Sequence, residues 1–220
     1  MSDLELELLD EELHGAAGGF LRVRRLHLRN RAADGTYSER YICDFATRPK
    51  GTDAVVVGLW RRRGDDIEVL LRTGLRPALV LGRVQEELPV RDEDPSPWMI
   101  EVVAGIIERE DHGEAGIRER AAIEAFEEAG LHIDAARVEL LGAGTFPTPG
   151  SMPEKFWLVA AEVDAGATAV PPPGDGSPME QGARTQWREL DAAIAACVAG
   201  EISDAKTELV LRRLRDRLRP

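Results

Sequence analysis

The chain has 220 residues, of which 43% are hydrophobic and 31% are charged, so it can bury a core and is not expected to be disordered throughout. Its formal net charge of −12 argues against nucleic acid and anionic membrane surfaces as partners, because both attract basic proteins. The two cysteines are too few for a disulfide scaffold, and no apolar run is long enough to cross a bilayer. The N-terminus is acidic where a signal peptide would be basic, so we expect a cytoplasmic location.

The N-terminal region divides into two predicted parts. The first fifteen residues contain six carboxylates and no Lys or Arg, which predicts a solvated acidic tail over residues 1–18. Residues 19–50 follow as a small β subdomain, with strands at 20–28 and 37–45 joined by a turn that contains Asp34-Gly35.

Residues 51–220 are predicted to form the main domain. Apolar runs and turn signals predict a buried hairpin first and then strands around one long helix. Two helices close the chain, and together these elements predict an α/β (α+β) sandwich. The expected strands are 54–60, 67–72, 98–105, 137–146, 156–163 and a short one at Trp187, and the expected helices are 114–130, 191–198 and 203–218.

The long helix has an acidic face. Glu124 and Glu128 are four residues apart and lie on one side, with Glu127 beside them, so the three carboxylates can converge. A plain solvated face is the alternative, since like charges at this spacing cost only a few tenths of a kcal/mol. Gly130 is expected to end the helix. The opposite face is expected to pack on a sheet through Ala122, Ala125, Phe126 and Ala129.

The segment from Gly105 to Leu131 resembles the Nudix box, which ends in the pattern Arg-Glu-x-x-Glu-Glu-x-Gly followed by an apolar residue. Glu124, Glu127, Glu128, Gly130 and Leu131 match this second half. The first half is longer than the family pattern, so that Glu108 and Glu114 are alternatives for its first glutamate.

One position departs from the box outright, because Ile123 occupies the arginine site. In the family this arginine is thought to orient the neighbouring carboxylates, which an isoleucine cannot do. Arg120, one turn earlier, is a candidate for part of that role. Nudix members that hydrolyse UDP-sugars resemble this chain in lacking the arginine and in having an alanine after the first glutamate of the pattern, as in Glu124-Ala125.

Four further segments resemble the branch of the family that hydrolyses ADP-ribose and nucleoside-diphosphate sugars. Together with the box they span roughly residues 20–215. They are Gly74–Pro77, Glu101–Gly105, Phe146–Gly150 and Gly200–Thr207.

The resemblance implies a Nudix α/β/α sandwich that hydrolyses a pyrophosphate bond with Mg²⁺, or with Mn²⁺ as a substitute. Hard dications prefer oxygen ligands, and the ligands implied here are Glu124, Glu127, Glu128 and the Ala104 carbonyl. The implied general base lies in the loop 174–183, where we choose Glu180 over Asp175, with Glu127 as a second catalytic residue. A solvated loop glutamate is the alternative for Glu180.

The implied substrate-binding residues are Arg76, Glu101, Trp98, Pro149 and Gly150. An arginine fork matches phosphate oxygens, although a solvated arginine is an equal alternative for Arg76. We expect Trp98 and Phe146 to lie in the core unless they flank a base or sugar. Family members with such an N-terminal extension are typically homodimers. The competing hypothesis for the whole protein is a noncatalytic nucleotide-sugar sensor, which Ile123 makes plausible.

Overall fold

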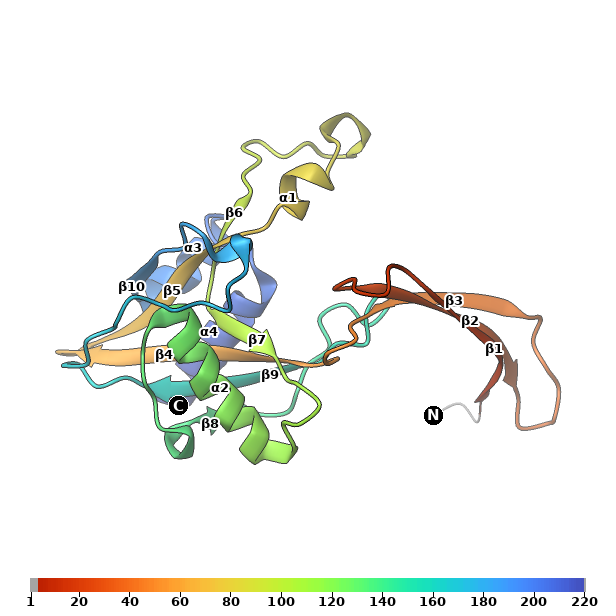
Figure 1. Ribbon diagram of the computed structural model, residues 1–220, viewed down its shortest axis with the longest axis horizontal. Coiled ribbons are helices and arrows are strands. Elements are labelled where there is room, and N and C mark those ends of the chain that lie inside the picture. The colour runs from red at the N-terminus through yellow and green to blue at the C-terminus, as the bar shows by residue number, and fades with distance from the viewer. Residues whose placement is uncertain (1–3, 220) are drawn as a thin grey trace.

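The computed structural model describes residues 4–219, which form two β-sheets and a set of helices (Figure 1). The first sheet, here called the arm, has the order β1-β2-β3, with β1 (Glu5–His14), β2 (Arg22–Arg31) and β3 (Tyr41–Thr47). The main sheet has the order β10-β5-β4-β9-β8, with β6 paired to β5 and β7 to β4. In Figure 1 the arm extends away from the main sheet and its helices.

The main sheet consists of β4 (Ala54–Arg63), β5 (Asp66–Leu75), β6 (Trp98–Glu101), β7 (Val103–Ile106), β8 (Glu139–Leu140), β9 (Phe156–Glu162) and β10 (Thr185–Glu189). The helices are α1 (Ala78–Leu81), α2 (Gly113–Ala129), α3 (Leu190–Val198) and α4 (Ala205–Leu218). Three short 3-10 turns are η1 (Gln85–Glu87), η2 (Ala135–Arg137) and η3 (Pro178–Glu180). In the part of the chain that the structure describes, no helix is both long enough and apolar enough to cross a membrane.

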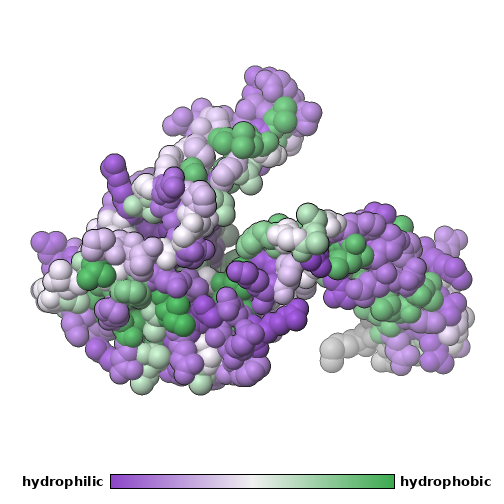
Figure 2. All heavy atoms as spheres, in the orientation of Figure 1, coloured by the Kyte–Doolittle hydropathy of each residue, from purple (hydrophilic) through white to green (hydrophobic). Residues whose placement is uncertain are grey.

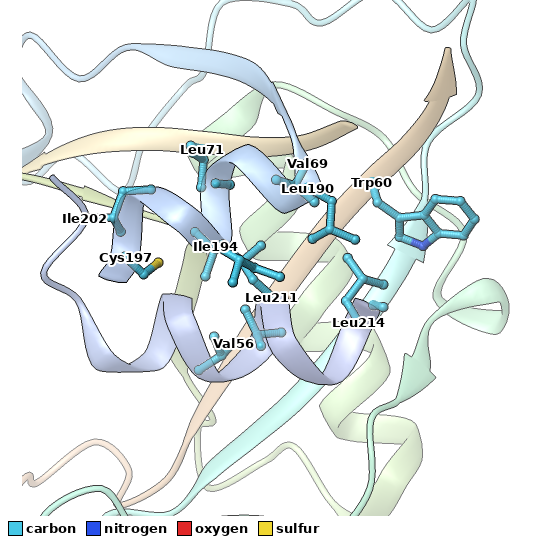
Figure 3. Packing of buried hydrophobic residues seen from close by; sticks show 14 of the residues in the cluster. Val56, Trp60, Val69, Leu71, Leu190, Ile194, Cys197, Ile202, Leu211 and Leu214 are labelled. Atoms are coloured by element: carbon cyan, nitrogen blue, oxygen red, sulfur yellow. The ribbon is translucent and has the colours of Figure 1, made fainter. Parts of the chain in front are cut away.

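Helices cover both faces of the main sheet. On one face, α3 and α4 pack Ile194, Leu211 and Leu214 against strand residues such as Val56 and Leu71 (Figure 3). On the other face, α2 packs against the alternate residues of the same strands, since successive side chains of a strand point to opposite sides. The predicted α/β/α sandwich is therefore confirmed.

Helix α2 packs through a narrower stripe than the sequence suggested. Its buried positions are Gly116, Ile117, Ala121, Ala125 and Ala129, whereas Ala122 and Phe126 are only partly buried. Small residues at four-residue spacing let the helix approach the sheet closely. Gly130 ends α2 with φ of 65°, and a β-carbon there would lie 1.8 Å from the Val170 carbonyl oxygen. The predicted helix end is confirmed, and only glycine fits it.

The predicted acidic tail was wrong for the residues that the structure describes. Residues 5–14 form β1, and Asp3 lies outside the described residues. The carboxylates of β1 find basic partners across the strand pair: Glu11 accepts hydrogen bonds from Arg24, and Glu7 from Arg29. The boundary at residue 50 stays a prediction.

Two predicted strands also differ. The strand at 98–105 is split at Val102 into β6 and β7, because its halves pair with different strands. The strand at 137–146 shrinks to the two residues of β8, with an isolated bridge at Thr145. Gly142 in this segment has φ of 96°, which a strand does not accommodate.

Candidate active site

A cavity of about 530 Å³ lies between α2, β5, β7 and the loop before β10. Carboxylates and cationic side chains face each other across it, so it is suited to a charged ligand. Its charged lining residues are Lys50, Arg72, Arg76, Glu108, Arg120, Glu124, Glu127, Glu128, Asp175 and Glu180.

Glu128 is fixed by two donors. One of its carboxylate oxygens accepts a hydrogen bond of 3.0 Å from the backbone N–H of Ala104 on β7. The other accepts a hydrogen bond from the guanidinium of Arg72 on β5. Burial raises the pKa of Glu128 to about 7, although Arg72 and the Ala104 N–H act in the opposite direction. The two donors therefore offset only part of the free-energy cost of burying a charged Glu128 carboxylate.

Glu124 lies one turn before Glu128 and rests on β7 at Gly105. A β-carbon on Gly105 would lie 1.9 Å from the carboxylate carbon of Glu124, so only glycine lets the strand pass beneath it. Burial and the negative charges of Glu128 and Glu127 raise the pKa of Glu124 to about 8. Neighbouring buried carboxylates with raised pKa values are typical of a functional site.

Arg120 contacts Glu124 less closely than the sequence suggested. Its Nη1 is 4.0 Å from Glu124 Oε1, whereas its Nε donates to Asp111 at 2.8 Å. Glu108 lies 3.5 Å from the same guanidinium. Of the two alternatives for the first glutamate of the box, Glu108 lines the cavity, whereas Glu114 is exposed and pairs with Arg118 at 3.6 Å.

Glu127 also lines the cavity, yet the three glutamates do not converge. Within residues 4–219, no group of three or more His, Cys, Asp or Glu side chains is arranged to hold a metal ion. In this conformation the two oxygens of Glu128 accept hydrogen bonds from the Arg72 guanidinium and the Ala104 N–H. The expected convergence is therefore absent from this conformation, although all three carboxylates belong to one cavity.

Arg76 reaches the cavity from the end of β5 and is anchored from behind. Its Nη2 donates to Glu101 at 2.5 Å, and Lys206 at the start of α4 donates to the other oxygen of Glu101 at 2.7 Å. Glu101 is only 1% exposed. Burial alone would raise its pKa, but Lys206 and Arg76 together hold the pKa of Glu101 below its usual range. Glu101 is thus a support for Arg76 and does not itself line the cavity.

Glu180 lies on the loop that closes the cavity opposite α2. Its Oε2 accepts a hydrogen bond of 2.7 Å from the Asp175 N–H, and its Oε1 is 3.9 Å from Arg72. Burial raises the pKa of Glu180 above its usual range. The same loop is tied to the end of α2, because the Gly174 N–H donates to the Glu127 carbonyl at 2.9 Å. This arrangement brings Glu180 to the same cavity as the helix glutamates.

Besides Glu101, three further predicted substrate-binding residues lie outside the cavity lining. They are Trp98, Pro149 and Gly150, and all three are exposed. The expectation that Trp98 and Phe146 lie in the core was wrong, because they are 43% and 50% exposed. Phe146 instead stacks under the Lys155 ammonium, 4.8 Å from its ring centre.

Sequence reasoning missed three cavity residues, Arg72, Lys50 and Phe20. Arg72 carried a signal, since it ends the apolar run of β5 two residues after Leu70, which is buried on the α2 face. Alternation along a strand places residue 72 on that same face. Phe20 comes from the connection between β1 and β2, and Lys50 follows β3, and nothing in their local sequence indicated the cavity.

Several solved structures are similar to this chain. One is the apo form of the T. brucei MERS1 protein, with 16% identity, a TM-score of 0.41 and coverage of 69% of this chain and 60% of that one. A C. elegans Ap4A hydrolase in a binary complex has 18% identity and a TM-score of 0.43, with 76% and 97% covered. The NUDIX domain of Shewanella oneidensis NrtR with ADP ribose has 15% identity and a TM-score of 0.44, with 76% and 88% covered.

The chain spans less than two thirds of the MERS1 protein. At such identities and TM-scores these similarities assign neither a family nor an activity. No known family profile matches the sequence, and no curated protein matches it either.

Proposed function

We propose that the protein is a Nudix hydrolase that cleaves the pyrophosphate bond of ADP-ribose or of a nucleoside-diphosphate sugar, giving a nucleoside monophosphate and a sugar phosphate. The observation that carries the proposal is the position of Glu124, Glu127 and Glu128, the residues that resemble the box, in one cavity with cationic side chains. A diphosphate has negative oxygens for the cations and for a metal bound to the carboxylates.

The donor set fits a hard dication. Burial raises the pKa values of Glu124 to about 8 and of Glu128 to about 7, so the charged forms of these carboxylates are disfavoured without a cation, and a bound dication would stabilise them. Mg²⁺, or Mn²⁺ in its place, would be held by Glu124, Glu127, Glu128 and the Ala104 carbonyl, and would supply charge neutralisation on the diphosphate and an acidified water.

The other side chains complete the proposed chemistry. Arg76, which is held in place by its hydrogen bond to Glu101, binds a substrate phosphate oxygen. Glu180, whose pKa is raised by burial, accepts the proton of the attacking water as general base, assisted by Glu127. Attack on one phosphorus breaks its bond to the bridging oxygen, and this oxygen leaves with the other phosphate.

We further propose that the protein is a homodimer in which a second copy covers the arm. One face of the arm carries leucines that are solvent-exposed in the single chain, whereas the other face carries ion pairs such as Arg25 with Asp44. Green patches mark apolar residues on the arm in Figure 2. A three-stranded sheet needs a covered apolar face to be stable. The exposed members of that face are Leu6, Leu8, Leu13 and Tyr41.

The dimer has its own test. Light scattering on the wild type is expected to give twice the chain mass, and Leu8→Glu is expected to give the monomer mass. Val23→Glu on the opposite face of the arm is the matched control, because Val23 is 42% exposed and should leave the dimer intact. A monomeric wild type would contradict the assembly without touching the proposed activity.

The activity is tested with a panel of diphosphates that contains ADP-ribose, UDP-sugars, GDP-sugars, a dinucleotide and coenzyme A. We expect Mg²⁺-dependent release of a nucleoside monophosphate from at least one member, and loss of that release in Glu128→Gln. Glu119→Gln is the matched control, since Glu119 is exposed on the same helix and outside the cavity. Binding without turnover for every compound would instead support the noncatalytic sensor.

A further inference from the structure

Arg72 is a charged residue at a position where the sheet buries apolar ones. It follows Leu70 on the α2 face of β5 and is only 5% exposed. Burying a guanidinium is costly unless carboxylates partner it, so this position is informative. Arg72 also lines two adjoining cavities, of about 320 and 530 Å³, that share Glu127, Glu128 and Glu180.

The Arg72 guanidinium contacts carboxylates from two separate elements. Its Nη1 donates to Glu128 on α2, and its Nη2 lies 3.9 Å from Glu180 on the loop before β10. Its Nε has no hydrogen-bond partner among residues 4–219. The guanidinium therefore lies between a carboxylate of the helix, to which it donates, and a carboxylate of the loop within ion-pair distance.

The arginine that is thought to orient the carboxylates in the Nudix box lies on the helix, and this chain lacks it. Ile123 is 41% exposed and has no donor to offer. Arg120 is engaged by Asp111 at 2.8 Å and reaches Glu124 only at 4.0 Å. Arg72 is the cation that bonds directly to Glu128.

We infer that Arg72 is a positioning residue of the carboxylate site, which takes over from strand β5 the orienting role that Ile123 cannot perform from the helix. The inference rests on the proposed function and adds a residue to it. Arg72 holds Glu128 in the orientation also fixed by the Ala104 N–H, and its charge attracts Glu180 across the same cavity. Outer-shell partners of this kind change metal affinity or activity by about 10–100-fold when they are removed.

The test compares wild type, Arg72→Met and Arg72→Lys by Mn²⁺ binding, measured by electron paramagnetic resonance without substrate, and by kcat and KM. We expect Arg72→Met to weaken Mn²⁺ binding and to lower kcat by about 10–100-fold, with a smaller change in KM. Arg72→Lys keeps the charge but loses the fork, so it should recover part of both quantities.

The matched control is Arg61→Met, which breaks the Arg61–Glu68 pair between β4 and β5 outside the cavity. It should lower the melting temperature and leave Mn²⁺ binding unchanged. Should Arg72→Met fail to fold, Arg72→Lys decides the matter alone, with wild-type circular dichroism and weaker Mn²⁺ binding expected.

Wild-type Mn²⁺ binding and kcat in folded Arg72→Lys and Arg72→Met, or tighter Mn²⁺ binding in either, would overturn the inference. If Glu128→Gln also retained both properties, the proposed site itself would fail. If Glu128→Gln lost both while the Arg72 variants kept them, only the role of Arg72 would fail.

Discussion

Gly105 on β7 lies directly beneath the carboxylate of Glu124 on α2, at a distance that leaves no room for a β-carbon. We therefore predict that Gly105→Ala displaces Glu124 and lowers kcat/KM by at least about 10-fold, because a displaced ligand is held out of its working geometry. Steady-state kinetics with Mg²⁺ measures this. Gly166→Ala is the control, since a β-carbon there meets no atom within 4 Å. Equal kcat/KM for both variants would show that activity does not depend on the position of the Glu124 carboxylate against Gly105.

The raised pKa values predict an unusual dependence of stability on pH. Glu124 and Glu128 have pKa values of about 8 and about 7 in the folded protein, against an ordinary value of 4.5. Between about 4.5 and about 8 the folded state therefore binds more protons than the unfolded chain, so stability must fall as pH rises through this window.

Urea unfolding across that window measures the effect without metal. The free energy of unfolding of the wild type should decrease relative to Glu124→Gln by an amount on the order of a few kcal/mol. Added Mg²⁺ should restore it if the carboxylates bind the ion. A wild-type curve that stays parallel to that of Glu124→Gln would contradict the burial of charge at this position.

Glu101 is predicted to support both stability and substrate binding. Glu101→Gln leaves Arg76 and Lys206 without their shared anion, which should cost roughly 2–3 kcal/mol, less than a fully buried pair because Arg76 can reach water. Since Arg76 loses its anchor, KM should rise more than kcat falls. Glu68→Gln is the control, because Glu68 pairs with Arg61 outside the cavity. A stability loss with unchanged KM would leave Glu101 a purely structural residue.

The start of α4 supports the same anchor. The Asp204 side chain accepts a hydrogen bond of 3.0 Å from the Thr207 N–H and one of 2.9 Å from Lys206. Asp204→Ala should therefore destabilise the protein by about 1–2 kcal/mol, the usual cost of a lost N-cap. Thermal unfolding checks this, and Asp216→Ala, in the last turn of the same helix, should change the melting temperature little. Equal melting temperatures for Asp204→Ala and wild type would contradict the cap.

The excess of negative charge predicts a salt dependence. With a net charge of −12, the protein repels anionic substrates at long range, and salt screens that repulsion. At saturating Mg²⁺, kcat/KM should increase with ionic strength while kcat stays constant. An unchanged kcat/KM would show that the local cations of the cavity, and not the whole-protein charge, govern capture.

The sequence predicted those parts of the fold in which the hydrophobic pattern along one segment matches the way that segment packs. The apolar strands β4 and β9 and the helix α2 with Gly130 at its end follow from runs, periodicity and a positive-φ glycine. The strand β1 was missed although Leu4, Leu6 and Leu8 alternate with glutamates, because its basic partners lie on another strand and cannot be counted along the chain.

The site was predictable only where it lies on one element. Glu124, Glu127 and Glu128 share a helix, so spacing placed them together. Arg72 and Lys50 reach the cavity from other elements, and the place of Arg72 beside the helix glutamates depends on the order of the strands in the main sheet. Trp98, by contrast, was predicted as a substrate-binding residue, yet it lies outside the cavity lining.

The most direct measurement is anomalous diffraction from crystals soaked with Mn²⁺ and a nucleotide diphosphate. We expect a manganese peak bound by the carboxylates of Glu124 and Glu128. Carboxylates that keep their metal-free positions, with no manganese near them at saturating concentration, would contradict the proposal that α2 carries a metal site.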